Sequence, residues 1–510
     1  MKEKRWLRKL FRQRCIVAVL ILLQIALLIY LIVNRSRSSQ MFGILMTIIS
    51  FFVSLHIAVQ PRKTVYKVTW IFLILSFPLF GGLLYLLLYL QTSSKRIRSA
   101  VYPSKNFQES KYLPGDAMVQ ISKHAPEHLQ QVRYLQEYAG YPVYSGTKTQ
   151  YLSPGEAAFP VILEELEKAE QYIFLEFFIV QEGVMWDSIL EVLKRKVKEG
   201  VTVRLLYDDI GCLMLLPKNY PQTLREYGIE CVAFNPFRPL LTVTQNNRDH
   251  RKIIVIDGKT AFTGGMNLAD EYINGFQKHG YWKDACIMLQ GKAAWSFAVM
   301  FLEMWQLCSG RKEQIEAFYP QVLSENAASD GYVQPYGDSP ADEEYVSEHV
   351  YLQMIHHAKN YLYINTPYLV IDETLMTALS LAAKSGVDVR IVTPHIWDKK
   401  PVHMTTRSYY KELLDAGVKI YEYTPGFMHS KVMISDDETA VIGTVNLDYR
   451  SLYLHYECGA WLHGSTAVME AKEDFLNTLK ECQPITAADC KTGLLTKAVN
   501  TALRLLAPLM

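Results

Sequence analysis

The stretch HRKIIVID at residues 250–257 is matched by HSKVMISD at residues 429–436 of this 510-residue chain. In both copies His is followed by one residue and Lys, then by four residues and Asp, then by six residues and Gly-x-x-Asn. Five matched positions at identical spacing, 179 residues apart, are far from chance, so this repeat decides how the chain is interpreted. The shared positions are His250, Lys252, Asp257, Gly264 and Asn267 in the first copy and His429, Lys431, Asp436, Gly443 and Asn446 in the second.

The residue types indicate chemistry on a phosphate. His and Lys two positions apart in an apolar run point from the same face of a strand. An ammonium group binds phosphate oxygens, and imidazole can attack phosphorus or move a proton near neutral pH. With two histidines, one can form a phosphohistidine while the other protonates the leaving alcohol and later deprotonates the incoming one. The Gly-x-x-Asn segments would bring backbone and amide groups to the same oxygens.

No cluster of carboxylates or of Cys and His stands at metal-ligand spacing in the sequence, so catalysis is expected to need no metal and no cofactor. The eight cysteines are scattered without a Cys-x-x-Cys and indicate reduced, structural thiols. The net charge of the whole chain is +2. The first fourteen residues alone have a charge of +6, so the rest of the chain is slightly acidic. That balance excludes a broad basic face for nucleic acid.

The repeated pair resembles the double HKD motif of the phospholipase D superfamily. Residues 250–272, the segment Tyr281-Trp-Lys-Asp284 and residues 407–451 are similar to bacterial cardiolipin synthases, and the similarity extends over nearly the whole chain. It implies an enzyme that joins two phosphatidylglycerols into cardiolipin and releases glycerol. It also implies His250, Lys252, Asp257, His429, Lys431 and Asp436 as the catalytic set, with Asn267, Asn446 and Glu457 in support.

Family analogy favours His250 as the nucleophile and has Asp257 and Asp436 orient the catalytic histidines. Each aspartate also follows an apolar run where a turn begins, so a turn-forming role is the alternative. Three other functions stay open: a phospholipase D-like hydrolase, a phosphatidyltransferase with another alcohol acceptor, and an inactive membrane scaffold. A scaffold would have lost His or Lys from one copy, whereas both copies are intact here.

Three apolar runs, at about residues 15–33, 41–60 and 68–90, are each long enough to cross a bilayer. They predict N-terminal transmembrane helices and a multi-pass protein of the cell membrane, with residues 1–100 as the anchor. The basic N-terminus favours a cytoplasmic start, but basic residues flank the third run on both sides, so the sidedness stays open. Pro78 at the centre of the third run also leaves open whether it spans or re-enters.

Beyond the anchor the fold class is α/β. Strand and helix patterns begin at Tyr172 and again at Tyr361, and each series ends in one of the His strands. We expect mostly parallel, buried sheets in two phospholipase D-like halves, related by a pseudo-twofold axis with the active site at their interface. The predicted parts are a connecting segment at 101–145, a first half at 146–325 and a second half at 326–510.

Residues 494–506 form an amphipathic helix that either lies on the membrane or packs on the domain. The sequence does not give the oligomeric state.

Overall fold

The computed structural model describes residues 37–60, 63–77, 81–82, 85, 117–237, 246–320, 330–341 and 344–509. The chain forms two compact units. One takes residues 1–95, 237–246 and 501–510, and the other takes residues 96–236 and 247–500. The first predicted span, at residues 15–33, lies outside the described residues.

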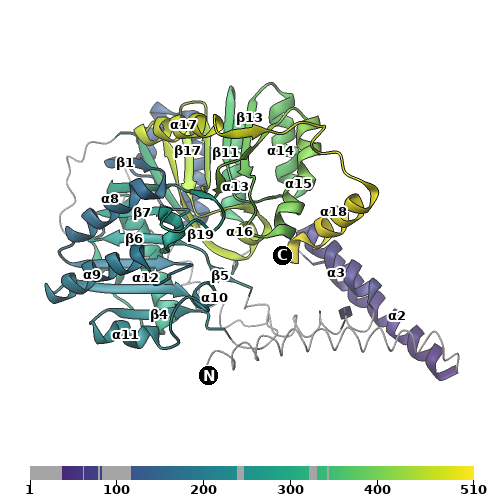
Figure 1. Ribbon diagram of the computed structural model, residues 1–510, viewed down its shortest axis with the longest axis horizontal. Coiled ribbons are helices and arrows are strands. Elements are labelled where there is room, and N and C mark those ends of the chain that lie inside the picture. The colour runs from purple at the N-terminus through teal and green to yellow at the C-terminus, as the bar shows by residue number, and fades with distance from the viewer. Residues whose placement is uncertain are drawn as a thin grey trace. The chain divides into compact units, whose positions relative to one another are not determined.

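The larger unit is built on two sheets (Figure 1). The first has seven strands in the order β1-β9-β7-β6-β2-β3-β4. The second has the order β10-β19-β17-β16-β11-β13-β14-β20, and β5 pairs with β19 off this path. The strands of the first sheet are β1 (Thr147–Leu152), β2 (Tyr172–Phe177), β3 (Thr202–Asp208), β4 (Glu230–Phe234), β6 (Lys252–Ile256), β7 (Thr260–Gly264) and β9 (Cys286–Gly291). Those of the second are β5 (Arg248–Asp249), β10 (Tyr332–Asp338), β11 (Tyr361–Asn365), β13 (Asp388–Pro394), β14 (Lys419–Tyr423), β16 (Val432–Ser435), β17 (Thr439–Gly443), β19 (His455–His463) and β20 (Cys482–Pro484).

The expectation of mostly parallel sheets was wrong. Among the described strands, β2, β3 and β4 pair in parallel in the first sheet, and β11, β13 and β14 do so in the second, where β5 also pairs in parallel with β19. The two His strands, β6 and β16, run antiparallel to their neighbours on both sides. Each folds directly into a hairpin, with β7 or β17, through a turn of left-handed residues: Asp257 and Gly258 in the first and Asp436 and Asp437 in the second. A short hairpin turn joins only antiparallel strands.

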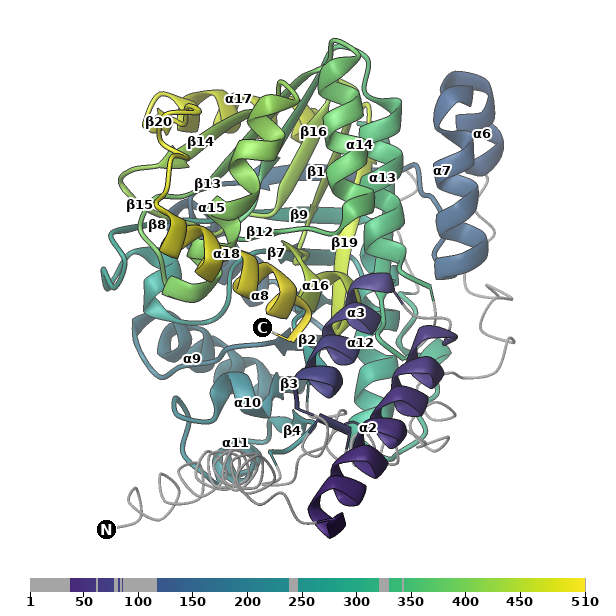
Figure 2. The ribbon, with the colours of Figure 1, turned by 90° about the vertical axis from the view of Figure 1, so that its right-hand side faces the viewer.

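The two sheets share one core. Helix α12 (Ala294–Ser309) is apolar around most of its circumference, and such a helix is stable only when buried on all sides. Its residues belong to a hydrophobic cluster that also holds Val255 of the first sheet and Ile442 of the second. The outer face of the first sheet packs against α8 (Gly155–Glu167) and α9 (Val184–Lys198), which belong to a separate cluster. Figure 2 shows the helices α13 (Val346–His357), α14 (Glu373–Lys384) and α15 (Lys400–Asp415) on the second sheet.

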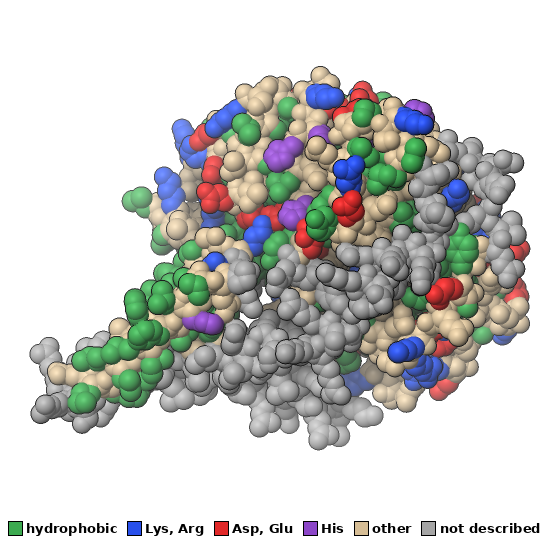
Figure 3. All heavy atoms as spheres, turned by 180° about the vertical axis from the view of Figure 1, so that it is seen from behind, with side chains coloured by type: hydrophobic (Ala, Val, Ile, Leu, Met, Phe, Trp, Pro, Cys, Tyr) green, Lys and Arg blue, Asp and Glu red, His purple; other side chains and the backbone are tan. Residues whose placement is uncertain are grey.

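The smaller unit contains α2 (Arg37–Ala58) and α3 (Thr64–Ser76). Of the described residues, Gln40–Ala58 alone forms a helix long and apolar enough to cross a membrane. Its apolar side chains are largely exposed (Figure 3), as they are in a helix that faces lipid. The third span, predicted at residues 68–90, overlaps α3 (Thr64–Ser76), which is shorter than a bilayer crossing, and most of the rest of that span lies outside the described residues. The structure therefore bears out one spanning helix where the sequence predicted several.

The C-terminal end of α18 (Leu494–Leu506) belongs to this smaller unit. The hydroxyl of Thr69 on α3 donates a hydrogen bond to the carbonyl oxygen of Leu505 over 2.8 Å. Helix α18 buries none of its side chains, and Leu494 and Leu495 are 87 % and 81 % exposed. The amphipathic helix predicted at residues 494–506 is therefore present, and its last turn contacts an apolar helix.

Candidate active site

Two short strand pairs cross between the halves and carry the two histidines. Strand β5 of the first half pairs in parallel with β19 of the second, and β15 (Gly426–Met428) of the second half pairs in parallel with β8 (Tyr281–Lys283) of the first. The backbone N–H of His250 donates to the carbonyl of Tyr456 over 2.9 Å, and that of His429 donates to the carbonyl of Lys283 over 2.8 Å. Each histidine is thereby fixed beside a strand of the opposite half.

The residue that follows each of these carbonyl groups is an acid. Glu457 lies 2.8 Å from Nδ1 of His250, and Asp284 lies 2.6 Å from Nδ1 of His429. Both carboxylates are fully buried. A carboxylate that accepts from Nδ1–H fixes the ring and its tautomer, so Nε2 is left free to attack phosphorus or exchange a proton. The site therefore contains two acid–imidazole pairs, and each pair is made from both halves.

Glu457 was expected in a supporting role, and the structure makes it the direct partner of His250. Asp284 was not predicted as a site residue, although it ends the Tyr-Trp-Lys-Asp segment. The internal repeat could not have revealed it, because Asp284 follows Asn267 by 17 residues whereas Glu457 follows Asn446 by 11. Only the pairing of strands from opposite halves brings Asp284 to His429.

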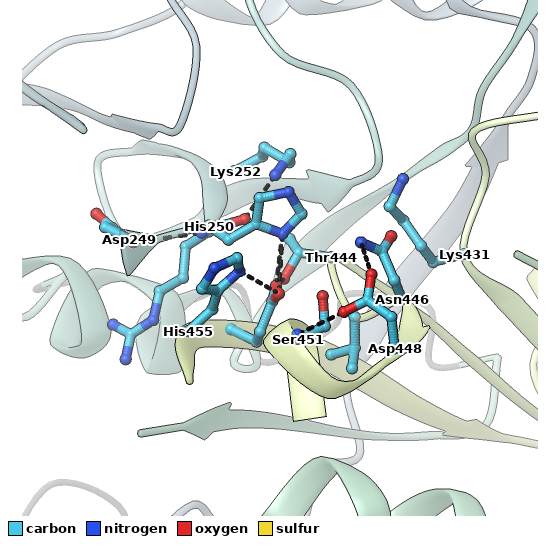
Figure 4. Close-up of polar contacts among 12 residues, drawn as sticks. Asp249, His250, Lys252, Lys431, Thr444, Asn446, Asp448, Ser451 and His455 are labelled. Atoms are coloured by element: carbon cyan, nitrogen blue, oxygen red, sulfur yellow. Dashed lines mark hydrogen bonds and ion pairs between the residues drawn. The ribbon is translucent and has the colours of Figure 1, made fainter. Parts of the chain in front are cut away.

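The lysines of both copies lie beside the histidines. The ammonium group of Lys252 donates to the carbonyl of His250 over 2.6 Å, and Lys431 makes the same contact with His429. Figure 4 shows Lys252 close to His250, and Lys431 beside Asn446. Burial lowers the pKa of Lys252 to about 8 and that of Lys431 to about 7. A bound phosphate would restore their full charge, because an opposite charge nearby favours the protonated amine.

Both imidazoles are held in the neutral form. Burial, followed by the charges of Lys252 and Lys431, brings the pKa of His250 well below its usual value. Burial and the charge of Lys431 lower the pKa of His429 to about 4, against the opposing effect of Asp284. A neutral imidazole is the form that can act as a nucleophile.

Asp257 and Asp436 do not orient the histidines, in contrast to the expectation from family analogy. The carboxylate of Asp257 accepts three backbone N–H groups, from Glu170, Gln171 and Tyr172, each over 2.8 Å. Asp436 accepts the equivalent three at the start of β11, from Lys359, Asn360 and Tyr361. Each aspartate thus joins its hairpin turn to the beginning of the adjacent strand. The turn-forming alternative holds, and Glu457 and Asp284 orient the imidazoles.

The two asparagines of the motif differ in their contacts. The amide of Asn267 accepts from the backbone of Ile179 over 3.0 Å and donates to the hydroxyl of Tyr272 over 2.7 Å. The Tyr272 ring lies 5.5 Å from that of His429, so Asn267 supports the wall of the site. Asn446 donates to Asp448 over 3.2 Å, and its buried amide oxygen has no hydrogen-bond partner among the residues that the structure describes.

A metal ion could be considered at one place in this site, since ligand atoms of His250, His455 and Glu457 lie within 4.8 Å of one another. The 2.8 Å between Nδ1 of His250 and Glu457 is a hydrogen-bond distance. Two ligands of a tetrahedral zinc ion stand farther apart, at about 3.4 Å for bonds of about 2.1 Å. The geometry here is that of an acid–imidazole pair.

Two α/β halves that each supply a His, a Lys and the acid for the other half define a phospholipase D-like fold and site. A family model described as "Cardiolipin synthase, PLD-like domain" matches residues 162–305 and 351–479, and one described as "Phospholipase_D-nuclease N-terminal" matches residues 44–88. The crystal structure of phosphatidylserine synthase from Haemophilus influenzae Rd KW20 has the same fold, with a TM-score of 0.56 at 16% identity over 74% of this chain and 97% of that one.

Curated relatives extend the similarity over most of the chain. A cardiolipin synthase from Geobacillus sp. (strain WCH70) is 38% identical, covering 90% of this chain and 92% of its own length. One from Geobacillus kaustophilus is 37% identical over 87% of this chain and 89% of its own. This chain therefore belongs to the cardiolipin synthase family and is a phosphatidyltransferase of the phospholipase D type.

Proposed function

We propose that this chain transfers a phosphatidyl group from one phosphatidylglycerol to another and releases glycerol. The observation that carries the proposal is the pair of buried acid–imidazole contacts, His250 with Glu457 and His429 with Asp284. One histidine would form a bond to phosphorus while the other handles protons, and the two lysines would hold the phosphate oxygens. Asn446, whose buried amide lies beside Lys431, would bind the same phosphate.

In the first step Nε2 of His250 attacks phosphorus, and the bond from phosphorus to the glycerol oxygen breaks. Protonated His429 gives its proton to that oxygen, so glycerol leaves as a neutral alcohol. Burial lowers the pKa of His429, but the negative phosphodiester and the buried carboxylate of Asp284 would both favour the imidazolium once substrate is bound.

In the second step the primary hydroxyl of another phosphatidylglycerol attacks the phosphohistidine. His429, now neutral, takes the hydroxyl proton, and the bond between phosphorus and His250 breaks. Both histidines return to their initial state, and the product is cardiolipin. The choice of His250 as nucleophile rests on the family resemblance, since both rings have the same kind of acid partner.

The chain is a membrane protein, and we propose that further N-terminal segments besides α2 cross the bilayer. Membrane anchoring would keep the site among acceptor lipids, which raises the effective concentration of the lipid hydroxyl relative to water. Phosphatidylglycerol and cardiolipin are the proposed partners, and nucleic acid is not one. We assign the two catalytic halves to residues 146–325 and 326–510, after a connecting segment at 101–145.

Product analysis with the purified protein in phosphatidylglycerol vesicles tests the proposal. Cardiolipin and free glycerol should appear in equal amounts, with little phosphatidic acid, and added glycerol should drive the reaction backwards. Phosphatidic acid as the main product would indicate a hydrolase instead. Product only after another lipid alcohol is added would change the acceptor. A preparation with both His250→Ala and His429→Ala controls for contaminating lipases.

A further inference from the structure

A second group of histidines lies far from the catalytic pair, at the other end of strand β19. This strand starts at His455, beside His250, and ends at His463. Nine residues of β-strand place these two ends about 26 Å apart. Next to His463 stands His128, the last residue of the short helix η2 (Pro126–His128), and Glu438 lies in the turn between β16 and β17. No step of the proposed reaction uses these residues.

His128 is buried but lacks hydrogen bonds. It is 5 % exposed, and neither of its ring nitrogens has a hydrogen-bond partner in the described part of the chain. Its ring centroid is 4.7 Å from that of His463 and 5.5 Å from that of His357, and one buried ring nitrogen of each of these neighbours is likewise unsatisfied. Buried polar atoms usually have a partner, so His128, with both ring nitrogens unsatisfied, is suited to bind a ligand.

The distances suit a metal ion better than they suit a hydrogen bond. Nε2 of His128 stands 3.6 Å from a carboxylate oxygen of Glu438, which is too long for a hydrogen bond. Two ligands on a tetrahedral zinc ion are separated by about 3.4 Å when the bonds are about 2.1 Å long. A carboxylate oxygen of Glu127 completes a set of three ligand atoms that all lie within 4.8 Å of one another.

The local charge favours a cation. His128 interacts electrostatically with the carboxylates of Glu127 and Glu438 and with the ammonium group of Lys359. Imidazole nitrogen combined with carboxylate oxygen is a donor set typical of zinc, whereas magnesium and calcium prefer oxygen alone.

We propose that Glu127, His128 and Glu438 bind a zinc ion, with His463 as the nearest further imidazole. The ion would join η2, in the segment that follows the N-terminal unit along the chain, to the sheet that carries Glu457. Its role would be structural, and it is independent of the phosphatidyl transfer proposed above.

Calorimetric titration of the full chain in detergent with Zn²⁺ tests this site, after chelator treatment and removal of the chelator. Wild-type protein should bind zinc and unfold at a higher temperature with it. His128→Gln should weaken binding at least tenfold. Glu438→Gln should do the same, and because the Glu438 side chain is 49 % exposed, this variant should fold normally. Exposed side chains outside the site supply controls, since His356→Ala and Glu473→Gln should leave zinc affinity unchanged.

Two results would overturn the proposal. One is the absence of zinc binding by the wild-type protein at millimolar concentration. The other is unchanged affinity in both His128→Gln and Glu438→Gln, which would place the ion elsewhere, for example at His250, His455 and Glu457. Because binding is measured by heat and by thermal unfolding, failure of the phosphatidyl transfer proposal would leave these readouts intact.

Discussion

At the scale of single residues, Glu457 and Asp284 supply buried negative charge beside His250, the proposed nucleophile, and His429, the proposed acid and base. An imidazolium in a buried site is unfavourable unless a carboxylate stabilises it, and each ring has one within 2.8 Å. The same carboxylates hold Nδ1 of each ring, so Nε2 is left free for the reaction.

Replacing either acid by its amide should slow the chemical step without unfolding the protein. Glu457→Gln and Asp284→Asn keep the side-chain shape, but they allow the wrong tautomer and remove the stabilising charge, so we expect kcat to fall by about 10² to 10⁴. Each His→Ala variant should lose at least as much, and the double His variant should lose little more, because the pair acts as one unit. Steady-state assays on phosphatidylglycerol measure this. Near-normal kcat in Glu457→Gln would refute the pairing.

Asp257→Ala should behave differently, because this side chain holds backbone groups and does not contact His250. Loss of its three accepted hydrogen bonds should lower the free energy of unfolding by about 3 kcal/mol. The fraction that remains folded should keep most of its kcat. Denaturant unfolding together with an active-site titration separates the two effects. A stable variant with lost turnover would return Asp257 to the catalytic set.

The pH dependence of kcat/KM should reflect the protonation of the two buried lysines, Lys252 and Lys431. Lys431 is charged below its pKa of about 7 and neutral above it, and Lys252 changes near 8. Because the charged form binds phosphate, kcat/KM should fall as the pH rises through this range. Lys431→Arg keeps its charge at any accessible pH, so the decline should move upward toward the titration of Lys252. An unchanged alkaline limb in this variant would contradict the assignment.

The two histidines and two lysines that the repeat predicts lie together in the structure, because their spacing is local and repeated, and their catalytic role stays a prediction. Family analogy had Asp257 and Asp436 orient the histidines, whereas the structure shows the turn-forming role that the sequence left as the alternative. Asp284 was missed because its partner, His429, is 145 residues away along the chain.

At the scale of elements, the placement of His250 depends on the two-residue strand β5. Arg248 on this strand makes a bidentate ion pair with Asp208 at the end of β3, and both side chains are almost fully buried. Asp208 also accepts the backbone N–H of Asp249, so one carboxylate fixes the strand that precedes the histidine.

Arg248→Met should therefore destabilise the fold and disturb the site together. Breaking a buried ion pair leaves an uncompensated charge and costs about 3–5 kcal/mol. Thermal or urea unfolding should show this loss, and the residual folded protein should have a reduced kcat. Arg195→Met removes an exposed pair with Glu167 and should leave both quantities unchanged. Equal effects of the two substitutions would refute a positioning role for β5.

The order of strands and helices followed from the sequence, whereas the direction of the His strands did not. Asp257-Gly258 between two apolar runs is a hairpin signal, and it was available in the sequence. The cross-half strands β5, β8 and β15 are two or three residues long and have no periodicity to detect, so tertiary packing alone defines them.

At the scale of the whole molecule, the anchor and the catalytic site are separate parts of the chain. Deleting residues 1–92 removes the apolar N-terminal segments but none of the proposed site residues. The truncated protein should fold, lose its membrane localisation and keep a weakened activity on lipid dispersed in detergent. Alkaline extraction followed by an activity assay measures both properties. A truncated chain that stays integral to the membrane would mean that another segment, such as α18, anchors it.

The exchange of acids between the halves also bears on how such a chain could have arisen. A protein with a single half would carry a histidine without its acid and an acid without its histidine. A symmetric dimer of that ancestor would satisfy both, since each copy would complete the other. Fusion of two gene copies preserves this relation. Neither half can then lose its acid without consequence, because a mutation of the acid in one half removes the partner of the histidine in the other half.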